Sequence, residues 1–505
     1  MIKDYSKSNK KMYLASIIES QMSIINQTIV KESIRMLLLF ALTIFIVYKL
    51  PREFGFIFVI SIVIIFWVSK NEYFWFAFFF IIICCPGNFF LSARIDSLYR
   101  LPPFSIGTDF TFSTHEIFMM AALLKAFVFG RKYCYILAKP LKLILFYAIF
   151  LLLLSMTIYG VSFDTWVFYL RNFIFYSYFI SFPALVKKRE EIIKFIWLPF
   201  PIMFFTFFTA VYFFIHGGHF LYLFDPGSLR DIHMLGGISR FGMFGGEHIL
   251  VLFCFIFSLF FSILKNNKNI YLISVGFISY LSILMTATRV WFIVYTFIFL
   301  IFLYKIKAKH IRRAIILLLT LIVLIYSLYN QNLVTERRIE STSERLASVF
   351  YLGDPRSEST QSFEYKSKVK LPKVFEGIKE NPIFGWGFSD RAMEIVNADV
   401  GNFALIGQVG IIGFLLFIYF WLSYFKLLLL ARKRLFKKDR VKDALLILGA
   451  SFFGFLIAHF TTHQFFGLTR FQYDIFFISA FIFLSEFFIK EAIKFGKSRQ
   501  LNKPI

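Results

Sequence analysis

The chain has 505 residues, of which 58% are hydrophobic and 21% aromatic. Soluble globular proteins are about 45–50% apolar, so this composition, with a mean hydropathy of +0.70, excludes a soluble globule and indicates a polytopic membrane protein. The net charge of +25 does not require a nucleic-acid partner, because the cytoplasmic loops of membrane proteins are rich in lysine and arginine. We therefore expect one all-α integral membrane domain over residues 1–505, without nucleic acid as a partner.

The N-terminal segment 1–34 is polar and carries lysines, and we expect it to be a cytoplasmic leader without a removable signal peptide. Apolar residues from Leu14 to Ile29 follow a nearly helical spacing. Both a helix on the membrane surface and a solvated leader are compatible with this spacing.

Apolar runs long enough to span a bilayer predict a transmembrane bundle of about 14 helices, with about 12 or 13 as alternatives. The expected spans are residues 36–50, 55–69, 73–86, 115–130, 142–159, 164–183, 192–215, 247–264, 270–288, 290–304, 314–329, 402–425, 444–460 and 473–489.

Basic clusters recur at 131–142, 187–189, 305–313 and 432–442. All of them fall on one side of the membrane if the N-terminus is cytoplasmic, as the excess of positive charge in cytoplasmic loops requires. We therefore expect both termini in the cytoplasm. The outer face then receives residues 87–114, 216–246, 330–401 and 461–472.

Residues 330–401 are the longest polar stretch, and we expect a large extracytoplasmic loop of short helices there. A loop of this length beside a bundle is usually functional. Within it, Asn381-Pro382 and Gly385-Trp386-Gly387 are turn formers that predict irregular backbone beside the bilayer. Such backbone is tolerated only where protein or a water-filled cavity covers it.

Asp399 lies just before the expected span at 402–425. A carboxylate there is a candidate general base toward an attacking hydroxyl. The alternative is a helix N-cap, a common role of aspartate.

Arg289 interrupts a long apolar run in Thr286-Ala287-Thr288-Arg289, at the expected outer surface. Arg240 precedes a glycine-rich turn before another expected helix. Two guanidinium groups from different loops suit a diphosphate, because they bind phosphate oxygens bidentately and stay charged. The alternatives are an arginine that extends to the lipid headgroups and a solvated arginine in a flexible loop.

Further candidates for substrate binding lie on the expected outer segments. They are Glu247 and His248 after the Arg240 turn, Arg345 in the long loop, and His463 and Arg470 in the last loop. A capping carboxylate and an interfacial histidine explain Glu247 and His248 equally well. The 4 cysteines show no metal-binding spacing, and the outer loops show no paired aspartates, so we expect neither a metal nor a cofactor.

Three of these elements resemble the signature of the O-antigen ligase and O-antigen polymerase superfamily. Residues 381–413 are similar to its NPxxGxG … [H/D]N … GxxG pattern, and residues 286–289 to its T-x-[ST]-R element. The Arg240 turn is similar to its R-x-x-G-x-x-x-x-[PE]-[NH] element, so the resemblance covers residues 230–425. It implies that Arg240 and Arg289 bind lipid diphosphate. Asp399 stands where ligases commonly have histidine, which favours the polymerase branch.

The resemblance implies a glycosyltransferase on the outer face of a bacterial cytoplasmic (inner) membrane. As a polysaccharide repeat-unit polymerase, it would move glycan from undecaprenyl diphosphate to a lipid-linked sugar acceptor. Its implied partners are the undecaprenyl-diphosphate-linked oligosaccharide, the lipid bilayer, and a chain-length regulator and a flippase of the same pathway. The alternatives are an O-antigen ligase with lipid A-core as acceptor, and a flippase or transporter of the same lipid-linked sugars. A transporter is less favoured because its polar residues would lie near the bilayer midplane.

Overall fold

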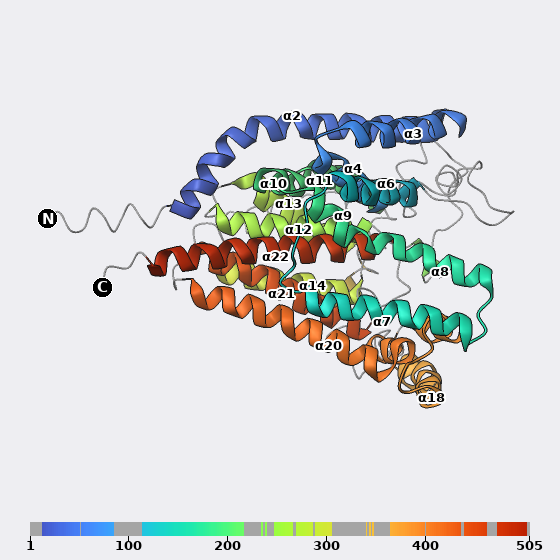
Figure 1. Cartoon of the computed structure of the whole chain (residues 1–505). Helices are drawn as coiled ribbons and strands as arrows, with labels where there is room; N and C mark the ends of the chain where they lie inside the picture. The colour runs from blue at the N-terminus through green and yellow to red at the C-terminus, as the bar shows by residue number, and fades with distance from the viewer. Residues whose placement is uncertain are drawn as a thin grey trace.

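The computed structural model describes residues 13–50, 52–84, 114–216, 234–235, 238–239, 247–265, 269–285, 288–305, 340, 343–344, 346–347, 364–398, 400–435, 439–461 and 472–501. These residues form a bundle of α-helices, which confirms the expected all-α class (Figure 1). Two short strands, β1 (Met234–Leu235) and β2 (Ile238–Ser239), pair antiparallel beside the helices.

The first half of the chain contributes nine of the described helices. They are α2 (Tyr13–Lys49), α3 (Arg52–Val68), α4 (Glu72–Cys84), α6 (Thr114–Phe129), α7 (Ala138–Thr157), α8 (Phe163–Tyr176), α9 (Tyr178–Leu185), α10 (Arg189–Trp197) and α11 (Pro199–His216).

The second half contributes the remaining described helices. They are α12 (Glu247–Leu264), α13 (Ile270–Met285), α14 (Arg289–Lys305), the π-helical turn η4 (Lys366–Lys370), α18 (Leu371–Glu380), α19 (Asp390–Asn397), α20 (Asn402–Arg434), α21 (Arg440–Thr461) and α22 (Gln472–Leu501).

Four segments in the described part of the chain are long and apolar enough to cross a membrane: Ala138–Thr157, Arg189–Phe208, Asn402–Arg434 and Arg440–Phe460. Several shorter apolar helices accompany them, among them α4, α12 and α13. The expected span at 314–329 lies outside the described residues. The count of 12 to 14 crossings therefore stays a prediction from hydropathy.

Two expected spans are interrupted. The span at 164–183 divides into α8 and α9 at Ser177, and the span at 192–215 divides into α10 and α11 at Leu198. Pro199 opens α11 without a backbone N–H, so the hydrogen-bond ladder of α10 does not continue through it. By contrast, the expected spans starting at 247, 270 and 290 match the starts of α12, α13 and α14 within one residue.

The expected leader at 1–34 is not separate from the first apolar helix over its described part. Helix α2 is continuous from Tyr13 to Lys49 and therefore includes most of the leader. The start of α2 and the end of α22 lie at the same end of the bundle (Figure 1). An even number of crossings produces this arrangement, while the side of the membrane on which the termini lie stays a prediction.

Two ion pairs join described helices inside the bundle. The Lys125 amine lies 3.1 Å from the Glu72 carboxylate and joins α6 to α4. The Lys194 amine lies 3.2 Å from Glu32, which also accepts a hydrogen bond of 2.6 Å from the Tyr73 hydroxyl. Isolated charges are costly in an apolar bundle, so each pair fixes two helices at one level.

Helix α22 holds the connection before α7 in the same way. The fully buried Glu486 carboxylate accepts hydrogen bonds from the backbone N–H groups of Ile136 (2.7 Å) and Leu137 (3.1 Å). It also pairs with Lys490 at 2.9 Å, and Lys490 donates to the carbonyl of Cys134 at 2.6 Å. These contacts satisfy backbone donors that lack a helical partner at the start of α7.

The expected membrane orientation, together with the positions of α18 and α20, predicts that two lysines lie on opposite sides of the membrane. They are Lys368, just before α18, and Lys433, near the end of α20. In a variant without native cysteines, Lys368→Cys should react with a membrane-impermeant maleimide in intact cells. Lys433→Cys should react only after permeabilisation, because the basic end of α20 belongs in the cytoplasm. Reaction of both positions in intact cells would contradict the predicted orientation.

Candidate functional site

Helix α20 is broken at Gly410, where φ is 67° and ψ is −178°. This backbone conformation is essentially restricted to glycine. The break leaves N–H and C=O groups on both sides without helical partners, which is costly inside a membrane bundle. The loop between α18 and α19 satisfies these groups.

Residues 381–388 pair with residues 407–412 across the break. Four backbone hydrogen bonds join them: Trp386 N–H to Gly407 O (3.0 Å), Gly387 N–H to Gln408 O (2.7 Å), Ile411 N–H to Pro382 O (2.9 Å) and Ile412 N–H to Ile383 O (3.3 Å). We refer to this pairing as the glycine clasp. It fills the gap in the hydrogen-bond ladder of α20 with donors and acceptors from the loop.

Two glycines make the close approach possible. A Cβ atom on Gly385 would meet the backbone of Gln408 and Gly410. A Cβ atom on Gly410 would meet the carbonyl of Ile383. Both glycines also have a positive φ, so another side chain is disfavoured by the backbone conformation as well as by space.

Tyr159, in the connection after α7, locks the loop side of the clasp. Its hydroxyl donates to Gly385 O at 2.7 Å and accepts from the Asn381 amide at 2.5 Å. The Asn381 amide donates to Gly385 O as well, at 2.8 Å. Burial raises the pKa of the Tyr159 hydroxyl above its ordinary value, so it stays protonated as the donor that Gly385 O requires.

Helix α7 supports the clasp from two further positions. The Tyr147 hydroxyl donates to Val409 O, next to the break, at 2.7 Å. The Ser155 hydroxyl accepts from the Phe388 N–H at 2.9 Å. The start of α20 and the loop are therefore positioned against α7.

A small apolar core joins α18, α19 and the first turn of α20. Its buried members are Val374, Ile395, Val400 and Ala404, with Leu371, Ile378, Trp386 and Ala398 packed against them. This core includes the residues on both sides of position 399. Asp399 itself lies outside the described residues.

The start of α20 is formed by a glycine that packs against α21. The N-cap residue is Gly401, with φ of 59° and no side-chain hydrogen bond to the helix. A Cβ atom on Gly401 would collide with the carbonyls of His459 and Phe460, so the start of α20 abuts the end of α21. Both predicted roles of Asp399, general base and helix N-cap, stay predictions, because Asp399 lies outside the described residues.

Helices α14 and α21 run antiparallel, which places Arg289 at this same end. Lys305, at the end of α14, pairs with Asp443, at the start of α21, at 3.2 Å. Further along, Gly454 faces the Val294 side chain. The start of α14 is thus level with the end of α21, and Arg289 opens α14 as a half-buried residue.

The start of α12 lies beside the start of α14. His248, the second residue of α12, is 7% exposed, and its ring centroid lies 5.2 Å from that of Trp291. Glu247 opens α12, but the description does not extend to its side chain. Helix starts carry a partial positive charge, so the starts of α12 and α14 are local positions that favour an anion.

The structure therefore brings Arg289, His248 and the start of α20 to one end of the bundle. Asn402, in the first turn of α20, was not predicted as a site residue; within the described part of the chain its buried Oδ1 atom accepts no hydrogen bond. The predicted site residues Arg240, Arg345, Asp399, His463 and Arg470 lie outside the described residues.

The described residues contain no group of three or more His, Cys, Asp or Glu side chains able to hold a metal ion. No protein-family model matches the chain, and no curated protein matches it either. The resemblance of residues 230–425 to a superfamily signature therefore stays a prediction from motifs.

The glycine clasp predicts that substitution by alanine destabilises the protein to different extents at two glycines of positive φ. Gly160→Ala has open space around the new methyl group, so it should cost only the backbone penalty, about 1–2 kcal/mol. Gly410→Ala adds a collision with the Ile383 carbonyl, and we expect a loss of about 3 kcal/mol or more. Thermal unfolding of the detergent-solubilised variants measures the difference, and equal losses would show that the clasp does not stabilise the protein.

Proposed function

We propose that the chain is a metal-independent, lipid-diphosphate-dependent glycosyltransferase, a polysaccharide repeat-unit polymerase of the bacterial cytoplasmic membrane. It would transfer a glycan from undecaprenyl diphosphate to the sugar of a second lipid-linked repeat unit on the outer face. The observation that carries the proposal is the convergence of the starts of α12, α14 and α20 at one end of the bundle. Arg289, His248 and Asn402 lie on these three helix starts.

The electrostatics of this end suit the leaving group. As the glycosidic bond breaks, the diphosphate gains negative charge. A guanidinium group at the start of α14, together with the partial positive charge of two helix starts, would stabilise that charge without a metal. We assign this role to Arg289, with Arg240 as the second predicted diphosphate ligand.

The packing of the residues on either side of Asp399 supports the role proposed for Asp399 toward the attacking hydroxyl. In the proposed mechanism Asp399 accepts the proton of the acceptor hydroxyl as general base. Its neighbours Ala398 and Val400 belong to the small core with α18 and α19, and Gly401 packs on α21. Packing of these flanking residues is favourable for a reaction that requires an oriented group.

The role of Arg289 predicts that the shape of the cation matters as well as its charge. Arg289→Lys should be nearly as damaging as Arg289→Ala, because lysine does not provide the bidentate fork. We expect each variant to lose on the order of 10²–10³ in polymerisation rate. Arg391→Lys is the matched control, since Arg391 pairs with Glu394 on the surface of α19. Full activity of Arg289→Lys would rule out a bidentate contact.

One polymerisation assay tests both the role of Asp399 as general base and the identity of the acceptor. Purified protein, given undecaprenyl-diphosphate-linked repeat units from its native host and EDTA, should make dimers and longer chains without lipid A-core. Asp399→Asn should lose about 10²–10⁴ in rate because the amide is not a base. Asp390→Asn, at the start of α19, is the matched control. A fully active Asp399→Asn variant would contradict the base assignment, and extension only after addition of lipid A-core would favour the ligase.

A further inference from the structure

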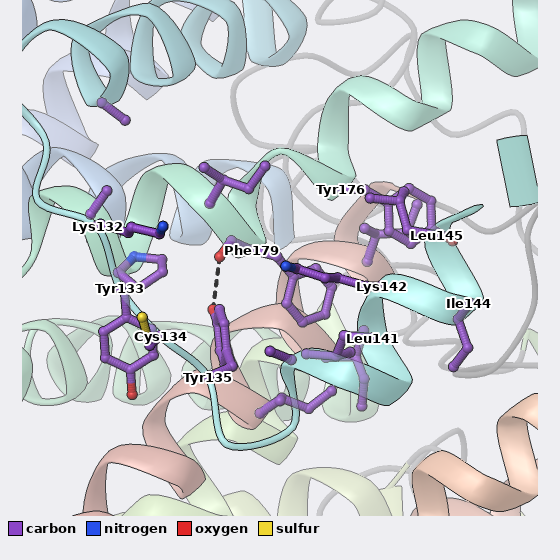
Figure 2. Close-up of a pocket in the computed structure, with 18 of the residues that line it drawn as sticks. Lys132, Tyr133, Cys134, Tyr135, Leu141, Lys142, Ile144, Leu145, Tyr176 and Phe179 are labelled. Atoms are coloured by element: carbon purple, nitrogen blue, oxygen red, sulfur yellow. Dashed lines mark hydrogen bonds between the residues drawn. The ribbon is translucent and has the colours of Figure 1, made fainter. Parts of the chain in front are cut away.

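A cavity of about 600 Å³ lies away from the proposed site, between the 131–137 segment, α7, α9, α20 and α22 (Figure 2). Its wall is mainly apolar and aromatic, with Leu141, Phe179 and Phe417 among the lining side chains. A volume of this size falls in the range of pockets that enclose one small molecule, about 300–1,000 Å³. The cavity is therefore large enough for part of a lipid chain.

Cations gather at the margin of the cavity. Arg131, Lys132 and Lys142 line it and are exposed, and none of them forms a salt bridge with another described residue. In Figure 2, Lys142 extends from α7 toward Phe179 and the 131–137 segment. Among the described residues that line the cavity there is no carboxylate. The cavity therefore has an excess of positive charge on one side and an apolar wall on the other.

The cavity opens among residues suited to the hydrocarbon of the membrane. Phe127 and Ile180 on its margin are 72% and 50% exposed. Helix α7 forms another wall, and only 28% of the residues in its apolar stretch are buried inside the protein. An exposed apolar margin favours an amphiphile that comes from the bilayer over a soluble anion.

The wall beside the cations is held in place. Besides the contacts of Glu486 and Lys490 described above, the Tyr135 hydroxyl donates to Phe179 O at 2.8 Å, as the dashed line in Figure 2 marks. The Lys490 amine also lies 4.0 Å from the centre of the Tyr133 ring. A preformed wall lowers the entropic cost of binding.

We propose that this cavity binds an anionic phospholipid of the surrounding membrane. Its headgroup phosphate would lie at Arg131, Lys132 and Lys142, and an acyl chain would occupy the apolar cavity. Basic pockets between membrane helices on the cytoplasmic side are suited to anionic headgroups, and the 131–142 cluster is predicted to face the cytoplasm. The proposal does not depend on the proposed transferase activity.

Native mass spectrometry of the full-length protein in detergent tests the proposal with phosphatidylglycerol and phosphatidylcholine of identical acyl chains. We expect phosphatidylglycerol to bind more tightly. The triple variant Arg131→Gln/Lys132→Gln/Lys142→Gln should lose roughly fivefold per charge, on the order of 100-fold in total. The matched triple Lys139→Gln/Lys188→Gln/Lys433→Gln removes the same charge from exposed positions outside the cavity and should leave the affinity unchanged.

A cavity-filling variant tests the position of the acyl chain. Ala148→Phe, or Leu145→Trp if the first variant is not monodisperse, should weaken phosphatidylglycerol binding at least tenfold while all cations remain. Unchanged affinity in the monodisperse cavity-filling variant, or equal losses in the two charge triples, would overturn the proposal. Displacement of the lipid by inorganic phosphate would indicate a soluble-anion site, and preferential displacement by undecaprenyl phosphate would indicate a pathway lipid. Either displacement would overturn the phospholipid assignment.

Discussion

The backbone pairing of residues 381–388 with residues 407–412 is the constraint on which the start of α20 and its neighbouring loop depend. A broken helix in an apolar bundle leaves peptide groups that cost several kcal/mol each when unpaired. The loop supplies their partners and cannot move away without exposing them. The loop between α18 and α19 and the start of α20 are therefore located by main-chain contacts, and Tyr147 and Tyr159 add side-chain contacts from α7 and the turn after it.

The opposite part of the bundle is held by charge. Glu486 joins α22 to the start of α7, and the pairs Lys125 with Glu72 and Lys194 with Glu32 join neighbouring helices. Each of these buried cations has a carboxylate partner, which lowers the cost of taking it out of water. Arg131, Lys132 and Lys142 differ because they stay exposed on the margin of the cavity, and this difference is the basis for assigning a lipid headgroup to them.

In the two proposals, the two regions would bind anions by different means. At the proposed transferase site the starts of α12 and α14 contribute oriented backbone dipoles, and Arg289 adds a guanidinium group to them. Dipoles and a planar fork in a supported geometry are suited to charge that develops during a reaction. Flexible lysines beside an apolar cavity are suited instead to a stable headgroup whose chain provides much of the affinity.

The sequence by itself determined the class of the protein and many helix starts. Hydropathy and charge bias act locally, so the starts of α12 at Glu247, α13 at Ile270 and α20 at Asn402 follow from composition along the chain. The glycine-rich stretch 381–413 was also recognised as irregular backbone at the start of a span. The residues that contact this stretch were not predicted. Tyr159 lies 226 residues before Gly385 in the chain, and no local pattern indicates which residues pair at that separation.

Only the tertiary structure decided that Gly385 and Gly410 allow the close backbone approach of the glycine clasp, and that Gly401 is the N-cap residue of α20. It also decided that His248 and Arg289 lie on neighbouring helix starts, through the contact of His248 with Trp291. The physical reason is the same for each. Close backbone approach and the level at which two helices meet depend on packing between distant segments, whereas hydropathy reports only whether a segment is apolar.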